Sequence, residues 1–318
     1  MLDTMHVPDG FLSVSVVVST WAGAGVSVSA ALVAERRETR PMAAGVLGAV
    51  AAFVFAAQMV NVPVAPGTSG HLVGATLAAL LVGPWRALLV MAVVLAVQAL
   101  LFQDGGITAF GANLLDMGLA GTVVGYTVAS LLARTGRGVR SVAAGGVLGA
   151  FAATLSAAAL TATWLSASGL YPLRILLPFM LVTHVAIGLL EAALTGGILV
   201  TILKWRPDLV AGLGAAPGER RPAAIGLGLL GVAFAIAAFV APFASSLPDG
   251  LDTAAEALGF AEKATSTFPA PLAGYSVPFI SSLALAPAFA GVMGTLAAAA
   301  LAWAVSRSLR RSDDELHR

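Results

Sequence analysis

Cysteine is absent from this sequence, and charged residues are scarce. Among the 318 residues there is no Cys, and Asp, Glu, Lys and Arg together make up 10% of the chain, whereas hydrophobic residues make up 58%. The lack of Cys excludes disulfides, thiolate metal sites and iron–sulfur clusters. A soluble domain carries about a quarter charged residues, so this chain has too little polar surface to coat a water-facing globule. The composition therefore predicts an integral membrane protein.

Motifs of several other protein classes are also missing. The sequence has no His-Glu-x-x-His motif of zinc proteases, no Gly-Lys-Ser/Thr phosphate loop and no evident Ser-His-Asp set. A net charge of +1 without a basic patch argues against a nucleic-acid partner. Residues 1–4 lack the positive charge that opens a cleavable signal peptide. We therefore expect a protein that is not an enzyme. If it moves a solute uphill, the energy comes from an ion gradient or from another subunit.

Long hydrophobic segments are what the sequence has in abundance. A spanning helix needs roughly 20 apolar residues. The segments predict helices at about 12–34, 42–64, 71–84, 86–103, 107–133, 141–168, 174–203, 223–245 and 276–305. The predicted fold class is therefore all-α, a polytopic helical bundle of about nine transmembrane helices, seven followed by two. We expect it in the cell inner (plasma) membrane, with lipid as a partner.

The basic residues predict how the bundle is oriented. When the nine segments are threaded in order, fifteen of the seventeen Lys and Arg residues fall on one side, and only Arg174 and Lys263 fall on the other. Basic residues in short loops mark the cytoplasmic side of a membrane. The N-terminus is therefore predicted outside and the C-terminus inside, which places Met5, His6 and His71 on the outer face.

The third segment is too short to cross a membrane as a helix. From His71 to Pro84 is fourteen residues, about 21 Å of helix against a hydrocarbon core of about 30 Å. Irregular backbone at membrane depth is tolerated where it is buried in protein or lines a wet cavity. We therefore expect residues 62–70, with their Pro and Gly residues, to dip into the membrane ahead of a half-helix. A shallow surface loop is the alternative.

A linker divides the chain into two domains. Residues 204–222 are rich in Gly, Pro and charge, and they fall on the cytoplasmic side. We predict a membrane domain at 1–203 and a two-helix domain at 223–318, whose helices flank an outer loop at 246–275. Pro-Asp-Gly occurs at 8–10 and again at 248–250. A turn explains each copy, because Pro and Gly favour turn dihedrals.

Histidines near the outer face are candidate metal ligands. If Met5 were the first residue, its amine, the amide nitrogen of His6 and the His6 imidazole could form adjoining chelate rings, with His71 completing a near-planar square. Such nitrogen sites suit Ni²⁺ or Cu²⁺, and imidazole also binds cobalt. The amine must lose its proton, so binding should weaken as pH falls. An ordinary polar tail and a helix-terminal histidine are the alternatives.

Other polar residues lie within the predicted helices, where they are costly and suggest function. His184 and Glu191 are seven residues apart and share one helix face. The pair could orient a ligand from behind or pin helix packing. Asn113 could line a polar interior or bridge helices. An intramembrane enzyme using His184 and Glu191 is a further alternative, although the sequence positions no nucleophile beside them.

Several short motifs carry a resemblance to a known family. They lie at 5–13, 67–72, 83–85, 98–102, 104–106, 111–113, 116–118, 184–188 and 191–192. Together they resemble the CbiM/NikM family, the substrate-capture components of energy-coupling factor transporters for cobalt and nickel. Residues 248–252 and 275–278 resemble the PDGLE domain, which is related to the small CbiN/NikN subunit. Here Asp252 replaces the usual Glu.

The resemblance implies a function, partners and ligands. It implies that the chain captures Co²⁺ or Ni²⁺ and works with a transmembrane coupling subunit (CbiQ/NikQ-like) and two cytosolic ATPase subunits (CbiO/NikO-like). The implied ligands are the amine of Met5, both nitrogens of His6, and His71, with His184, Glu191 and Asn113 behind them. Cobalt and nickel are not distinguished.

Two expectations remain open at this point. Residues 1–4 precede the N-terminal motif, and their retention would turn the Met5 amine into an ordinary amide, so we expect translation to start at Met5. An autonomous, ion-coupled divalent-metal carrier is the alternative to an ATP-driven complex, since the missing phosphate loop fits both.

Overall fold

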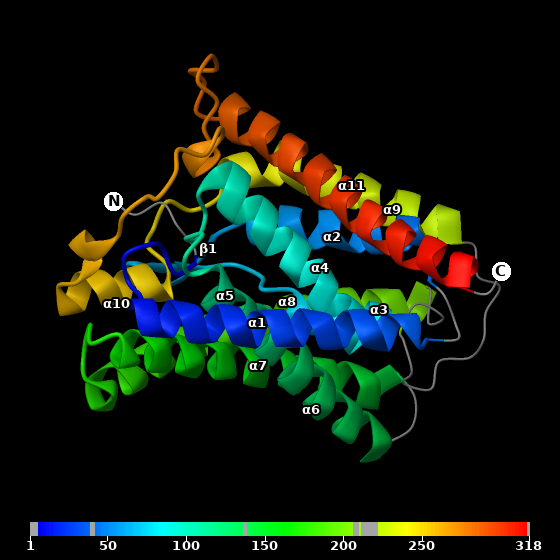
Figure 1. The fold of residues 1–318 in the computed structure, drawn as a ribbon, viewed down its shortest axis with the longest axis horizontal. Helices are drawn as coiled ribbons and strands as arrows, with labels where there is room; N and C mark the ends of the chain where they lie inside the picture. Colours follow the sequence, from blue (N-terminus) through cyan, green and yellow to red (C-terminus); the bar gives the residue numbers. More distant parts are fainter. Residues whose placement is uncertain (1–5, 39–41, 136–138, 206–209, 211–221, 317–318) are drawn as a thin grey trace.

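The chain folds into a bundle of long helices that run roughly along the longest axis of the molecule (Figure 1). The computed structural model describes residues 6–38, 42–135, 139–205, 210 and 222–316. The longer helices are α1 (Val14–Arg36), α2 (Ala44–Gln58), α4 (Pro84–Val97), α6 (Gly121–Thr135), α7 (Val139–Ala167), α8 (Leu173–Trp205), α9 (Pro222–Ala235) and α11 (Leu285–Leu316). The shorter ones are α3 (Ala75–Val82), α5 (Phe110–Asn113) and α10 (Gly250–Leu258).

Within the described residues, seven helices are long and apolar enough to cross a membrane. They include Pro84–Phe102, where α4 continues into a π-helical turn, and Phe110–Arg134, where α5 and α6 are joined by another. The chain is thus helical and multi-pass, as the hydrophobic segments predict. The other two predicted spans are shorter: α2 has 15 residues and α3 has 8. The count of nine and the orientation stay predictions.

The segment before α3 departs most from the prediction. The helix expected at 71–84 begins only at Ala75, and residues 71–74 before it have no regular secondary structure. The region expected to be an irregular loop forms an antiparallel hairpin of β1 (Val62–Ala65) and β2 (Thr68–Gly70). The Pro and Gly residues explain the turn. Pairing of the two strands gives hydrogen bonds to backbone N–H and C=O groups that an irregular loop would leave unpaired.

Small residues allow helices to approach closely. A Cβ atom placed on Gly149 of α7 would lie 2.4 Å from the carbonyl oxygen of Gly125 on α6, so the two backbones touch. In lipid, where no hydrophobic force drives helices together, such contact supplies packing energy. On the other side of the bundle, α9 and α11 pack on α2 through buried alanines such as Ala233 and Ala298.

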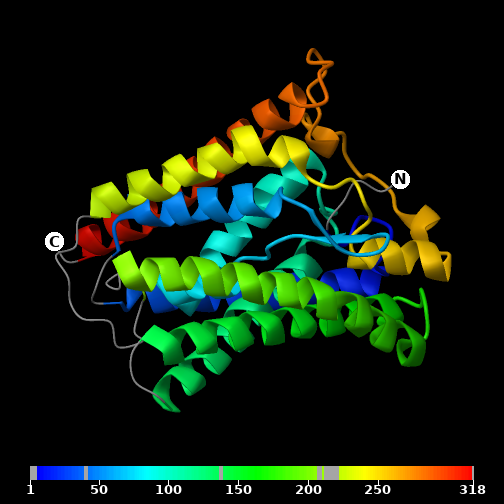
Figure 2. The same cartoon turned by 180° about the vertical axis from the view of Figure 1, so that it is seen from behind.

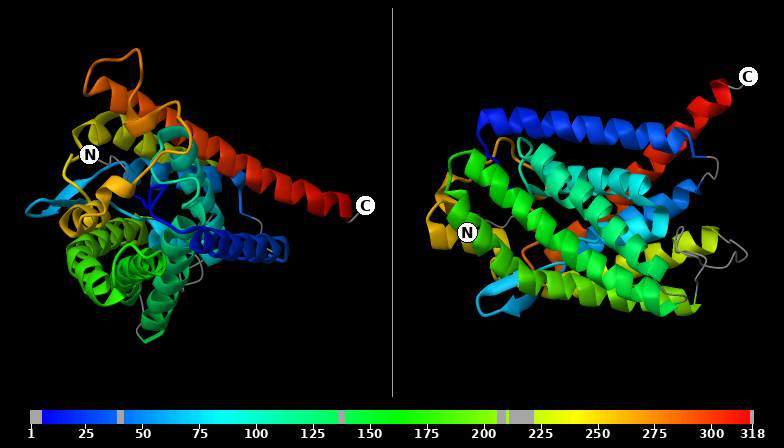
Figure 3. Two further views of the ribbon diagram at one scale, coloured as in Figure 1. Left: turned by 60° about the vertical axis from the view of Figure 1, so that its left-hand side comes forward. Right: turned by 90° about the horizontal axis from the view of Figure 1, so that it is seen from below.

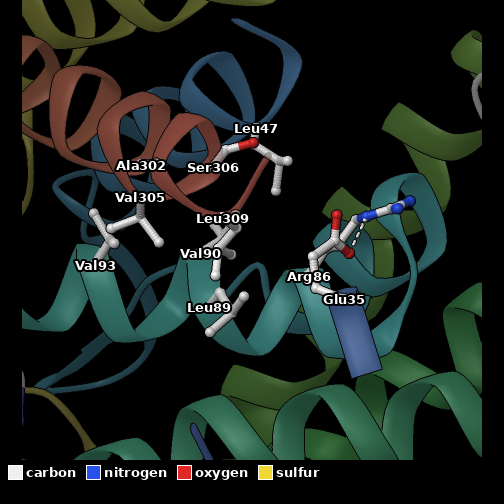
Figure 4. A pocket seen from close by; sticks show the side chains of 10 residues that line it. All are labelled: Glu35, Leu47, Arg86, Leu89, Val90, Val93, Ala302, Val305, Ser306 and Leu309. Carbon is white, nitrogen blue, oxygen red and sulfur yellow. Dashed lines mark hydrogen bonds and ion pairs between the residues drawn. The ribbon is translucent and has the colours of Figure 1, made fainter. Parts of the chain in front are cut away.

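The two ends of the bundle differ in chemistry. We call one the arginine end: there α1, α6 and α8 finish near Arg36, Arg134 and Lys204, and α11 stands clear of the other helices (Figure 3). Figure 4 shows an apolar groove between α4 and α11 at this end, beside an ion pair in which Arg86 Nε donates to Glu35 Oε2 at 2.6 Å.

The opposite end we call the histidine end. It gathers residues 6–13, the β1–β2 hairpin, the turn at 103–109 and α10 (Figures 1 and 2). Asp249 caps α10 by accepting hydrogen bonds from the Leu251 and Asp252 amides, both at 2.8 Å. Residues 246–275 lie against the hairpin and the N-terminal segment, because the Ser69 amide donates to the oxygen of Pro248 and the Thr265 amide donates to the oxygen of Asp9, both at 2.8 Å.

Candidate metal site

The segment that carries His6 is buried although it lies close to the start of the chain. His6 and Val7 are each 2% exposed. The side-chain amide of Asn113 pairs with both backbone groups of Val7: Asn113 Oδ1 accepts from Val7 N at 3.0 Å, and Nδ2 donates to Val7 O at 3.1 Å. The Gly106 amide donates to the same Val7 oxygen at 2.9 Å. Asn113 thus fixes the backbone next to His6.

Asp9 anchors the same segment from two sides. Its carboxylate accepts hydrogen bonds from the amide and hydroxyl of Thr108, at 2.7 and 2.6 Å, and from the hydroxyl of Thr267. Burial raises the pKa of Asp9, but these hydrogen bonds stabilise the charged form more, so its pKa lies below the usual range. A Cβ atom on Gly106 would lie 2.3 Å from Asp9 N, so glycine is required for this approach.

The segment that carries His71 is held by polar residues of two helices. Glu191 of α8 accepts hydrogen bonds from the amides of Val73 and Gly74, at 2.6 and 3.0 Å. Gln58 at the end of α2 donates to the oxygen of Val73 at 2.7 Å. The non-helical backbone after His71 therefore has hydrogen-bond partners at Val73 and Gly74 inside the bundle, and Glu191 supplies two of them.

These two segments bring the imidazoles of His6 and His71 together. Their ring centroids are 5.8 Å apart, and the rings are inclined at 77°. A metal–nitrogen bond is about 2.0–2.1 Å, so two imidazoles that share one ion have centroids within about 6.4 Å of each other. His71 Nδ1 donates to the oxygen of Leu72 at 3.1 Å. His6 Nε2 is buried and has no hydrogen-bond partner in the described part of the chain.

Asp104 completes the surroundings of His6. Its carboxylate lies 3.1 Å from His6 Nδ1 and accepts a hydrogen bond from the hydroxyl of Tyr275 at 2.7 Å. Burial lowers the pKa of His6, but the Asp104 carboxylate raises it by more, so the net shift is upward. An imidazole that donates from Nδ1 to a carboxylate presents the lone pair of Nε2, the arrangement found at many metal-bound histidines.

This orientation of His6 differs from the predicted chelate. Adjoining rings with the His6 amide nitrogen need Nδ1 as the ligand, whereas Nδ1 is turned to Asp104. In the described arrangement Nε2 is the nitrogen available to an ion. Met5, the source of the predicted amine ligand, lies outside the described residues.

A partly open pocket, lined by both imidazoles, extends from them into the bundle. Asn113, Asp116, His184 and Asp249 are among the residues that line it. His184 and Glu191, which share one face of α8, have different hydrogen-bond partners. His184 Nδ1 donates to the oxygen of Met180 at 2.7 Å, because a backbone acceptor lies one turn earlier on the same helix. His184 therefore reaches the cavity but is held independently of Glu191.

Among the described residues there is no group of three or more His, Cys, Asp or Glu side chains that could hold a metal ion. A cation at His6 and His71 would need further donors from backbone, from water or from the N-terminus. Nickel and cobalt accept such nitrogen and oxygen donors.

Sequence reasoning missed Asp104, Tyr275 and Asp249 as members of this site. All three lie in motifs that carry the family resemblance, at 104–106, 275–278 and 248–252. Those motifs were the signal that could have found them.

Comparison with known proteins identifies the family. The model of the CbiM family, described as the cobalt uptake substrate-specific transmembrane region, matches residues 6–209. The chain belongs to this family. A second model, that of the PDGLE domain, matches residues 223–311. As a CbiM-family member with seven apolar helices long enough to span, the protein is a multi-pass membrane protein.

Relatives cover either the whole chain or its family domain. A putative fused nickel transport protein NikMN from Archaeoglobus fulgidus is 36% identical over 311 residues, which are 96% of this chain and 99% of that protein. A cobalt transport protein CbiM from Sorangium cellulosum is 35% identical and matches 58% of this chain and 84% of its own. A crystal structure of a transition metal transporter matches 63% of this chain and 93% of its own, with a TM-score of 0.56 at 32% identity.

Proposed function

We propose that this protein captures Co²⁺ or Ni²⁺ for an ATP-driven transporter of the energy-coupling factor type. His6 and His71 bind the ion, joined by the amine of Met5 where the mature chain starts at that residue. Asn113 and Glu191 hold the two ligand segments in place, and His184 faces the same cavity. The relatives' names, which mention nickel and cobalt transport, support the choice of ions.

One observation carries this proposal: the unpartnered nitrogen of His6. A buried polar atom without a hydrogen bond costs free energy, about 1–3 kcal/mol. His6 Nε2 is such an atom, and it belongs to a ring whose centroid is 5.8 Å from that of His71. A divalent ion between the two rings would satisfy it. The nearby carboxylate of Asp104 would also offset part of the positive charge of a bound ion.

The proposed assembly divides the work between subunits. This chain lacks a phosphate loop, so we assign ATP hydrolysis to two cytosolic ATPase subunits and their coupling to a further transmembrane subunit. Residues 1–203 form the capture domain and 223–318 the PDGLE domain, joined by the linker 204–222. The spans of the two family models, 6–209 and 223–311, support this division.

Metal titration of the purified full-length chain tests the capture step. We expect one Ni²⁺ or Co²⁺ to bind per chain, with loss of tight binding in both His6→Ala and His71→Ala. Metal analysis and optical spectra then identify the ion, and N-terminal sequencing shows whether Met5 begins the mature chain. An isotherm unchanged in both variants would refute the site.

Uptake measurements test the energy source. We expect accumulation of metal only in cells that also carry the coupling and ATPase subunits. Uptake by this chain alone, abolished when the proton gradient is collapsed, would instead identify an autonomous ion-coupled carrier.

A further inference from the structure

The turn around Asp104 has an unusual backbone. Gln103, just before it, has φ of +56°, a left-handed conformation that residues other than Gly rarely adopt. A π-helical segment, Gln98–Phe102, leads into this turn. Such segments and strained residues often mark functional sites. The backbone is therefore shaped to bring the Asp104 carboxylate to His6.

The C-terminal domain presents a second strained residue to the same carboxylate. Tyr275 has φ of +55°, and its hydroxyl donates to Asp104 Oδ2 at 2.7 Å. Its ring stacks on Phe102, with centroids 4.7 Å apart and planes at 21°. The Leu272 amide donates to the oxygen of Leu101 at 2.9 Å, which fixes the approach of the two segments. Two independent backbone distortions thus meet at one hydrogen bond.

Together these contacts form a chain that ends at a proposed metal ligand. Tyr275 holds one oxygen of Asp104, and the other oxygen lies 3.1 Å from His6 Nδ1. A carboxylate has freedom to rotate, and a second hydrogen bond removes it. His6 Nδ1 also lies 3.3 Å from the main-chain oxygen of Asp104, so this residue faces the ring with two acceptors. The carboxylate is the nearer of the two, and fixing it restricts the plane of the imidazole and the direction of its Nε2 lone pair.

We propose that Tyr275 is a positioning residue of the metal site: its hydroxyl locks the Asp104 carboxylate, which in turn sets the orientation of the His6 ring. This inference rests on the proposed function, because it assumes that His6 binds the ion. In this inference the Tyr275 hydroxyl, which belongs to the PDGLE domain, affects metal affinity through Asp104, a residue 171 positions earlier in the chain.

The test is a double-mutant cycle on the purified full-length chain, with Ni²⁺ and Co²⁺ titrated separately. Tyr275→Phe removes the hydroxyl and keeps the stack on Phe102, and Asp104→Asn removes the carboxylate. Loss of an outer partner of a metal-bound histidine costs about 10–100-fold in affinity. We expect about 10-fold weaker binding in Tyr275→Phe and a shifted ligand-field absorption band of the bound ion. Tyr126→Phe is the matched control, because Tyr126 lies on α6 among apolar side chains.

The cycle separates positioning from a merely structural effect. If Tyr275 acts through Asp104, then adding Tyr275→Phe to Asp104→Asn causes no further loss. Wild-type affinity and spectrum in Tyr275→Phe would overturn the inference, and so would a full 10-fold loss in the Asp104→Asn background. If His71→Ala loses metal binding while Tyr275→Phe binds as the wild type does, this inference is wrong and the proposed function stands. Absence of binding in the wild-type chain would overturn the proposed function and this inference together.

Discussion

The histidine end and the arginine end of the bundle use polar residues in opposite ways. At the arginine end, the ion pair between Glu35 and Arg86 lies beside an apolar groove, and both side chains keep some exposure. At the histidine end, Asn113, Asp104 and Glu191 are buried and are bonded to residues from distant parts of the chain. The first arrangement is common where helices leave a membrane. The second arrangement costs free energy, because polar groups are removed from water, and such groups in a membrane protein often mark a functional site.

The difference teaches which substitutions should matter. A partly exposed ion pair contributes about 0–1 kcal/mol, because water and salt screen it. A buried polar group that loses its partner costs about 1–3 kcal/mol and releases whatever it was holding. Substitutions at the histidine end should therefore change metal binding, and those at the arginine end should change little.

The largest effect is expected from His71→Ala. The substitution removes one of two imidazoles that face each other, and we expect at least about 100-fold weaker binding of Ni²⁺ and Co²⁺, more than loss of an outer partner would cause. Isothermal titration measures it, and thermal unfolding should show that the chain still folds. His317→Ala, in the C-terminal tail, is the control. Equal affinity in the two variants would contradict the assignment of His71.

A large effect is also expected when residues 246–275 are replaced by a short Gly-Ser linker. These residues hold both ligand segments: the Ser69 amide donates to the oxygen of Pro248 at 2.8 Å, and Thr267 bonds to Asp9. We expect metal uptake by cells to be lost, while the purified chain still unfolds cooperatively.

Removal of residues 312–318, the last seven of the sequence, serves as the control for this replacement. Normal uptake after loss of 246–275 would reduce the outer loop to a packing role.

Asn113→Ala should have an intermediate effect. It breaks both hydrogen bonds to the backbone of Val7, so His6 gains freedom that binding must remove. We expect about 10-fold weaker metal binding. Asn61→Ala is a matched control, because the Asn61 side-chain oxygen is buried without a partner in the described residues. A similar loss in both would show that general loosening is responsible.

The smallest effect is expected from Glu35→Gln at the arginine end. The variant loses the charge that faces Arg86 but keeps a hydrogen-bond acceptor. We expect destabilisation of about 1 kcal/mol or less, measured by chemical denaturation in detergent, and unchanged metal affinity. A clear loss of metal affinity in Glu35→Gln would show that the arginine end also contributes to metal binding, contrary to the difference proposed between the two ends.

The helices could be predicted from the sequence because hydrophobic length is a local property. The span predicted at 174–203 is observed as Leu173–Trp205. The helix predicted from His71 was wrong at its start, because strand pairing within 62–70 and the hydrogen bonds from Val73 and Gly74 to Glu191 hold residues 71–74 out of the helix. Local apolar pattern carries no information about such contacts.

The candidate site was predictable only in part. His6 and His71 could be singled out as rare polar residues near a membrane face, and the structure brings their rings together. Asp104 and Tyr275 could not be paired by spacing, because 171 residues separate them. His184 and Glu191 bond to different backbone groups, because helical spacing shows that residues share a face but not which partner each prefers. The metal ligands and the domain boundaries stay predictions.

The contact between the start of the chain and its later part has a consequence for biosynthesis. The Thr265 amide donates to the oxygen of Asp9 at 2.8 Å, so the segment that carries His6 is paired with residues that the ribosome makes much later. That pairing cannot form until Thr265 has emerged and the intervening helices have been inserted. Until then, the oxygen of Asp9 in the newly made segment beside His6 lacks this hydrogen bond.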